Sequence, residues 1–150
     1  MADTISPEAR SRNMAAIRSR DTEPEIYIRK NLFARGLRYR KNAATVPGHP
    51  DLYFAKYRTA LFVNGCFWHR HKGCKYAYTP KSRVEFWQAK FAHNTERDQK
   101  VKDELNGLKI RCLIIWECTI RKMKKDTVLN DAVLDQIISF LNSSESFLEI

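Results

Sequence analysis

The segment spanning residues 48–74 constrains the fold most, because it joins two strand-like runs to a dense group of metal-binding side chains. Its two runs, residues 52–54 and 60–63, are rich in aliphatic, aromatic and β-branched residues, and a polar turn separates them. This pattern predicts a β-hairpin. Asp51 opens the first predicted strand, and a loop that carries two histidines and two cysteines follows the second.

Helical and strand patterns account for the rest of the chain. Apolar side chains recur at helical spacing in three segments, residues 22–36, 82–107 and 126–141. Residues 37–40 alternate apolar and basic side chains, as an edge strand does. Residues 110–116 form a nearly continuous apolar run, which is typical of a central strand covered on both faces. Residues 142–150 are predicted to fray. The sequence therefore predicts one α/β domain over residues 1–150, a mixed central sheet flanked by helices.

The chain is strongly basic. Its 27 lysine and arginine residues against 17 aspartate and glutamate residues give a formal net charge of +10 and a pI near 9.6. Such a surface can simply be a solvated one, but the 11% of aromatic residues beside the charge favours a nucleic acid as partner. The sequence shows no N-terminal apolar segment and no run long enough to span a bilayer, which predicts a cytoplasmic protein.

Residues 1–20 are predicted to form a basic arm. The short helix expected there has a thin apolar face that includes Met14, while Arg12 and other arginines supply charge. A helix of this kind is hardly stable alone. An arm that orders on the phosphate backbone of a nucleic acid is therefore favoured over a packed core helix.

Four cysteines in a basic intracellular protein indicate metal ligands more than disulfides. The predicted tetrahedral ligand set for a structural zinc ion is Cys66, His71, Cys74 and Cys118. His69 could replace His71, and Cys112 could replace Cys118. Cys118 is preferred because Cys112 lies inside the apolar run, where a free thiol serves as a small hydrophobic side chain.

Phe67 and Trp68 lie between two of the predicted zinc ligands, Cys66 and His71. A metal that pins both ends of this short arc would direct its middle residues outward, which makes the two rings candidates for a wedge between base pairs. Packing in the core is the alternative. The position in a short loop between ligands favours the wedge.

Several short motifs together resemble one known family. They are Pro50-Asp51, the segment Gly65-Cys66-Phe67-Trp68-His69-x-His71, Phe86-Trp87, Asn94, Arg97-Asp98 and Trp116-Glu117-Cys118. Over about residues 10–119 the chain resembles the very-short-patch-repair (Vsr) mismatch endonucleases. The resemblance implies a restriction-endonuclease-like α/β fold with a structural zinc site. It also implies an enzyme that nicks one DNA strand beside a T·G mismatch, the product of 5-methylcytosine deamination.

The resemblance also implies roles for individual residues. Asp51 would bind Mg²⁺, with the carbonyl of Val63 as a further ligand, and His69 would be the acid/base residue. Glu25 would support His69, although its spacing from Thr22 favours a capping carboxylate when the residues are read alone. The zinc ligands would be the four residues named above. The implied DNA contacts are Arg12, Met14, Phe67, Trp68, Trp87 and Asn94.

Two departures from the family pattern stand out. Position 64 is Asn, where some members have a second histidine, and Lys72-Gly73 looks like an insertion before Cys74. The expected partner is double-stranded DNA with a T·G mismatch, bound by a monomer, and other mismatch-repair proteins are further candidate partners. Two alternatives stay open: a zinc-stabilised DNA-binding module that does not cut, and a nuclease of the same fold with another target. A strand-start carboxylate beside the His69 loop favours the enzyme.

Overall fold

The structure is a computed structural model that describes residues 21–150, so the predicted arm with Arg12 and Met14 lies outside the described residues. Its strands are β1 (Arg40–Lys41), β2 (Leu52–Phe54), β3 (Thr59–Asn64), β4 (Arg111–Trp116) and β5 (Phe147–Glu149). Its helices are α2 (Glu23–Ala34), α3 (Val84–Gly107), α4 (Glu117–Lys125) and α5 (Thr127–Leu141), with a 3₁₀ turn at Ala55–Tyr57. No helix among the described residues has the length and apolar composition that a bilayer span requires.

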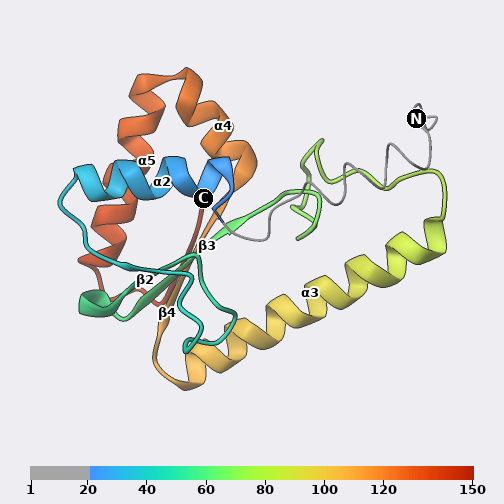
Figure 1. Ribbon diagram of the computed structural model, residues 1–150, viewed down its shortest axis with the longest axis horizontal. Coiled ribbons are helices and arrows are strands. Elements are labelled where there is room, and N and C mark those ends of the chain that lie inside the picture. Colours follow the sequence, from blue (N-terminus) through green and yellow to red (C-terminus); the bar gives the residue numbers. More distant parts are fainter. Residues whose placement is uncertain (1–20) are drawn as a thin grey trace.

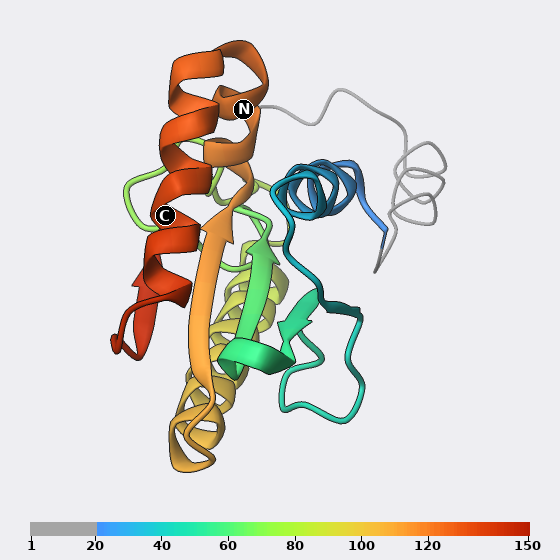
Figure 2. The ribbon, with the colours of Figure 1, turned by 90° about the vertical axis from the view of Figure 1, so that its left-hand side faces the viewer.

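The five strands form one mixed sheet in the order β1-β2-β3-β4-β5. β2 pairs antiparallel with both β1 and β3, which confirms the predicted hairpin. β3 and β4 are parallel, and so are β4 and β5. β4 is therefore an interior strand, as its continuous apolar run predicted. Figure 2 shows β3 and β4 side by side, with their carboxyl ends at the same edge of the sheet.

Helices cover both faces of the sheet, which confirms the predicted α/β architecture (Figure 1). Alternate residues of β4 point to opposite faces because successive side chains of a strand do so. Leu113 and Ile115 pack in the larger core with α2, α4 and α5. Ile114 and Trp116 pack in a smaller core that includes Leu105 of α3. α3 thus lies on the other side of the sheet from the remaining helices.

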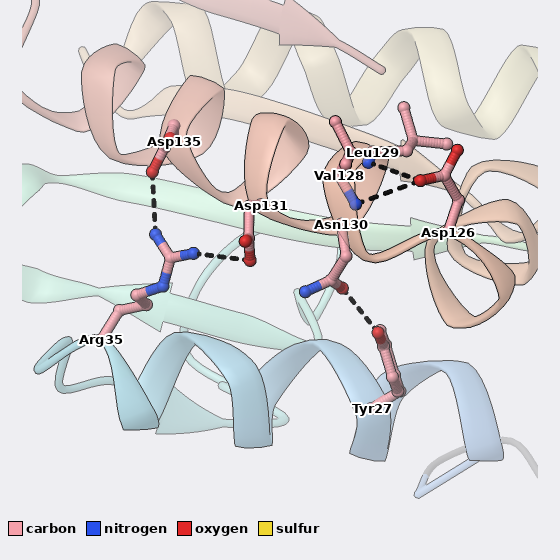
Figure 3. Close-up of polar contacts among 8 residues, drawn as sticks. All are labelled: Tyr27, Arg35, Asp126, Val128, Leu129, Asn130, Asp131 and Asp135. Atoms are coloured by element: carbon pink, nitrogen blue, oxygen red, sulfur yellow. Dashed lines mark hydrogen bonds and ion pairs between the residues drawn. The ribbon is translucent and has the colours of Figure 1, made fainter.

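Polar contacts fasten α2 to α5 (Figure 3). Near the start of α2, the Tyr27 hydroxyl donates to Asn130 Oδ1 at 2.5 Å. Near its end, Arg35 forms ion pairs with Asp131 at 3.1 Å and Asp135 at 2.8 Å. Ile28 and Leu32, fully buried, fill the space between helix and sheet. The rotation and position of α2 are thereby fixed, together with those of the acidic residue Glu25 that it carries.

Three expectations about the elements need correction. Residues 147–149 are not frayed: β5 pairs with β4, and the Trp116 indole donates to Glu149 Oε1 at 2.9 Å. Helix α4 follows β4 directly, although no helix was predicted there, since only Ile120 and Met123 of this charged segment are buried. The edge strand β1 starts at Arg40 rather than three residues earlier.

Candidate active site and metal cluster

The predicted catalytic residues line one cleft of about 860 Å³ at the edge of the sheet where β3 ends. Its acidic and imidazole side chains are Glu25, His49, Asp51, His69, Asp98 and Glu117. They come from α2, the segment that enters β2, the loop after β3, α3 and the start of α4. Because β2 runs antiparallel to β3, the beginning of β2 lies beside the end of β3, which brings residues far apart in sequence to one place.

Asp51 lies in the cleft beside the end of β3. Its Oδ2 accepts a hydrogen bond from the Val63 N–H at 2.7 Å, which aims the carboxylate along the end of β3. Burial, and next the neighbouring Glu25 carboxylate, raise the pKa of Asp51 to about 7, while the His69 ring acts in the opposite direction. Two carboxyl groups that disfavour each other's charge are a typical setting for cation binding. The structure places the Val63 N–H next to Asp51, and the role of the Val63 carbonyl as a Mg²⁺ ligand stays a prediction.

Glu25 is buried, with 6% of its surface exposed. Its Oε2 accepts the backbone N–H of Asp21 at 2.9 Å, so the carboxylate ties the residue before the N-cap Thr22 to the first turn of α2. The Thr22 side chain makes no capping hydrogen bond, so the reciprocal capping box is not formed. One carboxylate therefore holds the chain that enters α2 and also lies beside Asp51 in the cleft.

His69 is oriented by an acid on another element. Its Nδ1 lies 2.6 Å from Oδ2 of Asp98 on α3, and its backbone N–H donates to the Gly65 carbonyl. Since a carboxylate accepts hydrogen bonds, Nδ1 carries the proton and Nε2 is left as an acceptor. Both side chains are about one-quarter exposed, at 26% and 27%, so the ring is held and still accessible from the cleft.

Asp98 belongs to the Arg97-Asp98 motif, for which no role was predicted. The helical spacing of the buried residues of α3 does point to it. Trp87, Phe91 and Asn94 form the buried stripe of α3, and Asp98 lies one turn beyond Asn94 on the same side. A carboxylate that continues an otherwise buried stripe indicates a partner on the element packed against the helix.

The four predicted metal ligands lie together. The sulfur or nitrogen donor atoms of Cys66, His71, Cys74 and Cys118 are all within 4.8 Å of one another. Backbone hydrogen bonds from His71 to Cys66 and from Cys74 to His71 fold the loop into tight turns. Gly73 has a φ of +73°, a conformation that favours glycine and lets the chain return toward the cluster. The cluster uses His71, while His69 faces Asp98, and Cys112 of β4 is not a member.

Three sulfurs and one imidazole fit a tetrahedral metal shell. Zn–S bonds of about 2.3 Å place tetrahedral donors roughly 3.8 Å apart, within the 4.8 Å limit that holds for these atoms. Burial raises the pKa of the Cys66 thiol to about 12, so a nearby cation is needed for the thiolate form. The His71 ring also stacks on Trp116, with centroids 4.1 Å apart and an interplanar angle of 7°. Since Glu149 of β5 accepts from that indole, the C-terminal strand helps to support the cluster.

The predicted wedge rings do not project freely from the loop. Phe67 and Trp68 are partly buried and pack against each other at a centroid distance of 5.0 Å. Trp87 is 9% exposed and lies 5.4 Å from Phe67 and 5.9 Å from Trp68. Asn94 is 8% exposed, and its amide donates to the Trp68 carbonyl at 3.1 Å. These residues therefore form one packed aromatic group, and their contact with DNA stays a prediction.

Comparison with known proteins identifies the family of the chain. A sequence model of the family described as DNA mismatch endonuclease Vsr matches residues 2–76. A DNA mismatch endonuclease Vsr of Escherichia coli K12 is 42% identical over 127 residues, 85% of this chain and 81% of the relative. The type II nicking enzyme V.NmeAIP of Neisseria meningitidis is 40% identical over 121 residues, 81% of this chain and 86% of the relative. V.XorIIP, a type II nicking enzyme of Xanthomonas oryzae, is 40% identical over 120 residues, covering 80% and 88% of the two chains.

These similarities define the class of protein as an endonuclease that nicks DNA. More particularly, the chain belongs to the DNA mismatch endonuclease Vsr family.

Proposed function

We propose that this protein is a Mg²⁺-dependent endonuclease that nicks one strand of double-stranded DNA at T·G mismatches. The observation that carries the proposal is the meeting of Asp51 with the His69–Asp98 pair in one open cleft. A protein that only binds DNA gains nothing from buried carboxylates that would repel phosphate. The printed names of the relatives, a mismatch endonuclease and several nicking enzymes, support the same reaction.

Phosphodiester hydrolysis needs an activated water and relief of the negative charge on the phosphate. Asp51 and the carbonyl of Val63 would hold Mg²⁺, with Glu25 adding negative charge close by. When bound, the ion would supply charge neutralisation and a bound water of lowered pKa. His69 would move a proton at Nε2, while Asp98 holds the proton on Nδ1 and so fixes the ring. Some members of the family have a second histidine at position 64, where this chain has Asn. His69 would therefore be the only histidine of the pair in this protein.

The cluster of Cys66, His71, Cys74 and Cys118 would hold a structural zinc ion. A closed shell of four protein ligands leaves no open position for substrate, which is why we give this site no catalytic step. Its role is to fix the loop between β3 and α3. That loop positions His69 on one side and the aromatic rings of Phe67 and Trp68 on the other.

DNA would lie across the cleft, and Phe67, Trp68 and Trp87 would insert beside the mismatch. Asn94 would contact the DNA beside these rings. Arg12 and Met14 of the basic arm would contact the other side of the duplex. The net charge of +10 suits a phosphate backbone. We further propose a restriction-endonuclease-like fold, a cytoplasmic monomer, and other mismatch-repair proteins as partners, each as implied by the family resemblance.

The test compares the cleavage of duplexes that are identical except at one base pair. Purified protein is incubated with end-labelled duplexes that differ only at one position, carrying T·G, C·G or T·A, with Mg²⁺ or without a divalent cation. We expect nicks on the T strand of the T·G duplex alone, and only with Mg²⁺. Equal nicking of the C·G duplex would contradict the mismatch specificity and point to the alternative nuclease target. Binding of all duplexes without any nick would point to the non-cutting module.

The His69–Asp98 pair yields a separate prediction. In Asp98→Asn the amide nitrogen can donate to Nδ1, which stabilises the tautomer with its proton on Nε2. The turnover number should fall by roughly 10²–10⁴-fold with little change in the affinity for DNA, by analogy with the loss of an orienting acid in other histidine sites. Single-turnover nicking rates and gel-shift affinities measure the two quantities. Asp103→Asn is the control, since this acid also lies on α3 but bonds to Gln99 outside the cleft.

A further inference from the structure

We propose that Tyr78 is an additional DNA-stacking residue and that Arg70 is the positioning residue that holds it against the aromatic group. The proposal extends the proposed function, because it assigns part of the DNA-contacting surface. Neither residue belongs to the motifs that carry the family resemblance, and neither lines the cleft with Asp51. Arg70 lies in the metal-binding loop between Cys66 and His71, and Tyr78 lies in the segment between Cys74 and α3.

Arg70 binds the chain at two places at once. Its Nη1 donates to the carbonyl oxygens of Phe67 at 3.2 Å and Tyr78 at 3.0 Å. Its Nη2 donates to the Ala77 carbonyl at 2.8 Å and to Thr79 Oγ1 at 3.3 Å. The guanidinium group thus fastens residues 77–79 to the loop that carries the catalytic histidine. Only a planar fork with several donors can reach all these oxygens, and a lysine ammonium cannot.

The same guanidinium group is part of the aromatic packing. It lies 3.8 Å from the centre of the Phe91 ring, a cation–π contact at short range. Arg70 itself has a φ of +55°, a conformation that non-glycine residues adopt only with support from their surroundings. The four hydrogen bonds and the ring contact supply that support. Arg70 is therefore better explained as a structural brace for this segment than as a cation that binds the DNA phosphate.

The brace places Tyr78 at the open side of the aromatic group. The Tyr78 ring lies 5.2 Å from the Phe67 ring, yet 58% of the residue is exposed. Phe86, on the first turn of α3, lies 5.2 Å from Trp87 and is 44% exposed. Two exposed rings that lean on partly buried ones make a stacking surface larger than the three predicted wedge residues provide. No hydrogen bond involving the Tyr78 hydroxyl is present among residues 21–150, so the ring alone is its contribution.

The charges around this surface suit nucleic acid as its occupant. Arg83 lies over the Phe86 ring at 4.3 Å, and the Lys90 ammonium lies 6.0 Å from the Trp68 ring centre. Within residues 21–150, neither cation is part of an ion pair with a carboxylate. Exposed rings beside unpaired cations combine base stacking with phosphate attraction, which is the pattern of surfaces that bind unstacked bases. A surface held rigid in advance also loses less conformational entropy when DNA binds.

The first experiment tests Tyr78 with two substitutions. Tyr78→Leu keeps an apolar side chain and removes the ring, whereas Tyr78→Phe keeps the ring. We expect Tyr78→Leu to raise the Kd for the T·G duplex by about tenfold, the size that loss of one base–aromatic stack produces. Tyr78→Phe should bind like the parent protein. An unchanged Kd in Tyr78→Leu would overturn the proposal, and so would an equal loss in Tyr78→Phe.

The second experiment tests the brace with a double-mutant cycle. Arg70→Lys should raise the Kd about as much as Tyr78→Leu, and the double variant should be no worse than either alone, because both remove the same contact. A second measure is a 2-aminopurine base placed next to the mismatch, whose fluorescence rises when the base unstacks and should rise less in both variants. Additive losses would instead assign Arg70 a direct contact with DNA and overturn its role as a brace.

Controls separate this proposal from general loss of structure and from the proposed function. Arg38→Lys is the matched control, since Arg38 also lies over a ring, at 3.9 Å from Phe33, and donates to the Phe33 and Leu37 carbonyls at the far end of α2. It should leave the Kd unchanged. If the parent protein bound T·G and C·G duplexes equally, mismatch specificity would fail. The comparison of Tyr78→Leu with Tyr78→Phe on either duplex would still decide the role of Tyr78.

Discussion

Replacing Asp51 by Asn should abolish strand nicking, with a loss of at least about 10³-fold in the single-turnover rate. The amide has nearly the same shape and can still accept from the Val63 N–H, so the local backbone should keep its position. What it lacks is the negative charge and the second anionic oxygen that a divalent cation requires. DNA affinity measured without Mg²⁺ should stay within a few-fold of the parent value or improve, because one group that repels phosphate has gone. Nicking at the parent rate would remove Asp51 from the mechanism.

The same variant has an opposite effect on stability. Because burial and Glu25 raise the pKa of Asp51 from 3.8 to about 7, the ionised carboxylate is disfavoured in the folded protein. The folded state therefore binds this proton more tightly than the unfolded state does. Stability from that proton is fully present below about pH 4 and is lost as the pH rises to 7.

Without added Mg²⁺ at pH 8, Asp51→Asn should thus be more stable than the parent by on the order of 2 kcal/mol. At pH 4, close to the ordinary pKa of 3.8, Asp51 of the folded parent is protonated and the difference should largely vanish. Urea unfolding of both proteins at the two pH values measures it. Asp103→Asn is the matched control and should show neither the stability gain nor the loss of nicking, since Asp103 lies on the outer part of α3. A parent protein that is equally stable relative to Asp51→Asn at both pH values would contradict the raised pKa.

The elements that could be predicted are those whose own apolar residues form a pattern that indicates burial. β4 is a run of apolar side chains, so both its faces had to be covered, and α5 repeats apolar residues at helical spacing. β5 and α4 are different. The three residues of β5 form a strand because the edge of β4 is available for pairing. This pairing depends on the tertiary structure and not on the local sequence. α4 buries only Ile120 and Met123 beneath a basic surface, too few to produce a periodic signal.

The site divides in the same way. The metal cluster could be predicted because cysteine and histidine at these spacings indicate a metal site. Of the two ambiguous choices, Cys118 over Cys112 followed from Cys112 lying in an apolar run, and the choice between His71 and His69 needed the structure. The periodicity of α3 places Asp98 on the inner side of the helix, but it does not identify His69 as the partner, because the two meet only once α3 is packed against the loop. The wedge was expected to project, yet Phe67 is already surrounded by the rings of Trp68, Tyr78, Trp87 and Phe91. Local spacing does not show how many rings a distant helix brings to the same place.

Removal of one cluster ligand should have the largest effect on the fold. In Cys66→Ala we expect the zinc content to fall from about one equivalent to near zero, because three remaining donors cannot close a tetrahedral shell. Metal binding at a site absent from the unfolded chain contributes directly to folding, and structural zinc sites bind with about 10–16 kcal/mol at neutral pH. The loss of unfolding free energy should therefore be on the order of 5 kcal/mol or more, beyond what removal of one buried thiol costs.

Cys112→Ala is the matched control, since Cys66 and Cys112 are both buried cysteines, 2% and 6% exposed. Cys112 takes no part in the cluster, so this variant should retain its zinc and lose only about 1 kcal/mol of stability. Metal content by atomic emission and unfolding followed by circular dichroism measure both effects. The contrast matters for function because the cluster fixes the loop between Cys66 and Cys74, where His69 lies. If Cys112→Ala lost zinc while Cys66→Ala kept it, the fourth ligand would come from β4, and the loop could no longer place His69 opposite Asp98 as the structure has it.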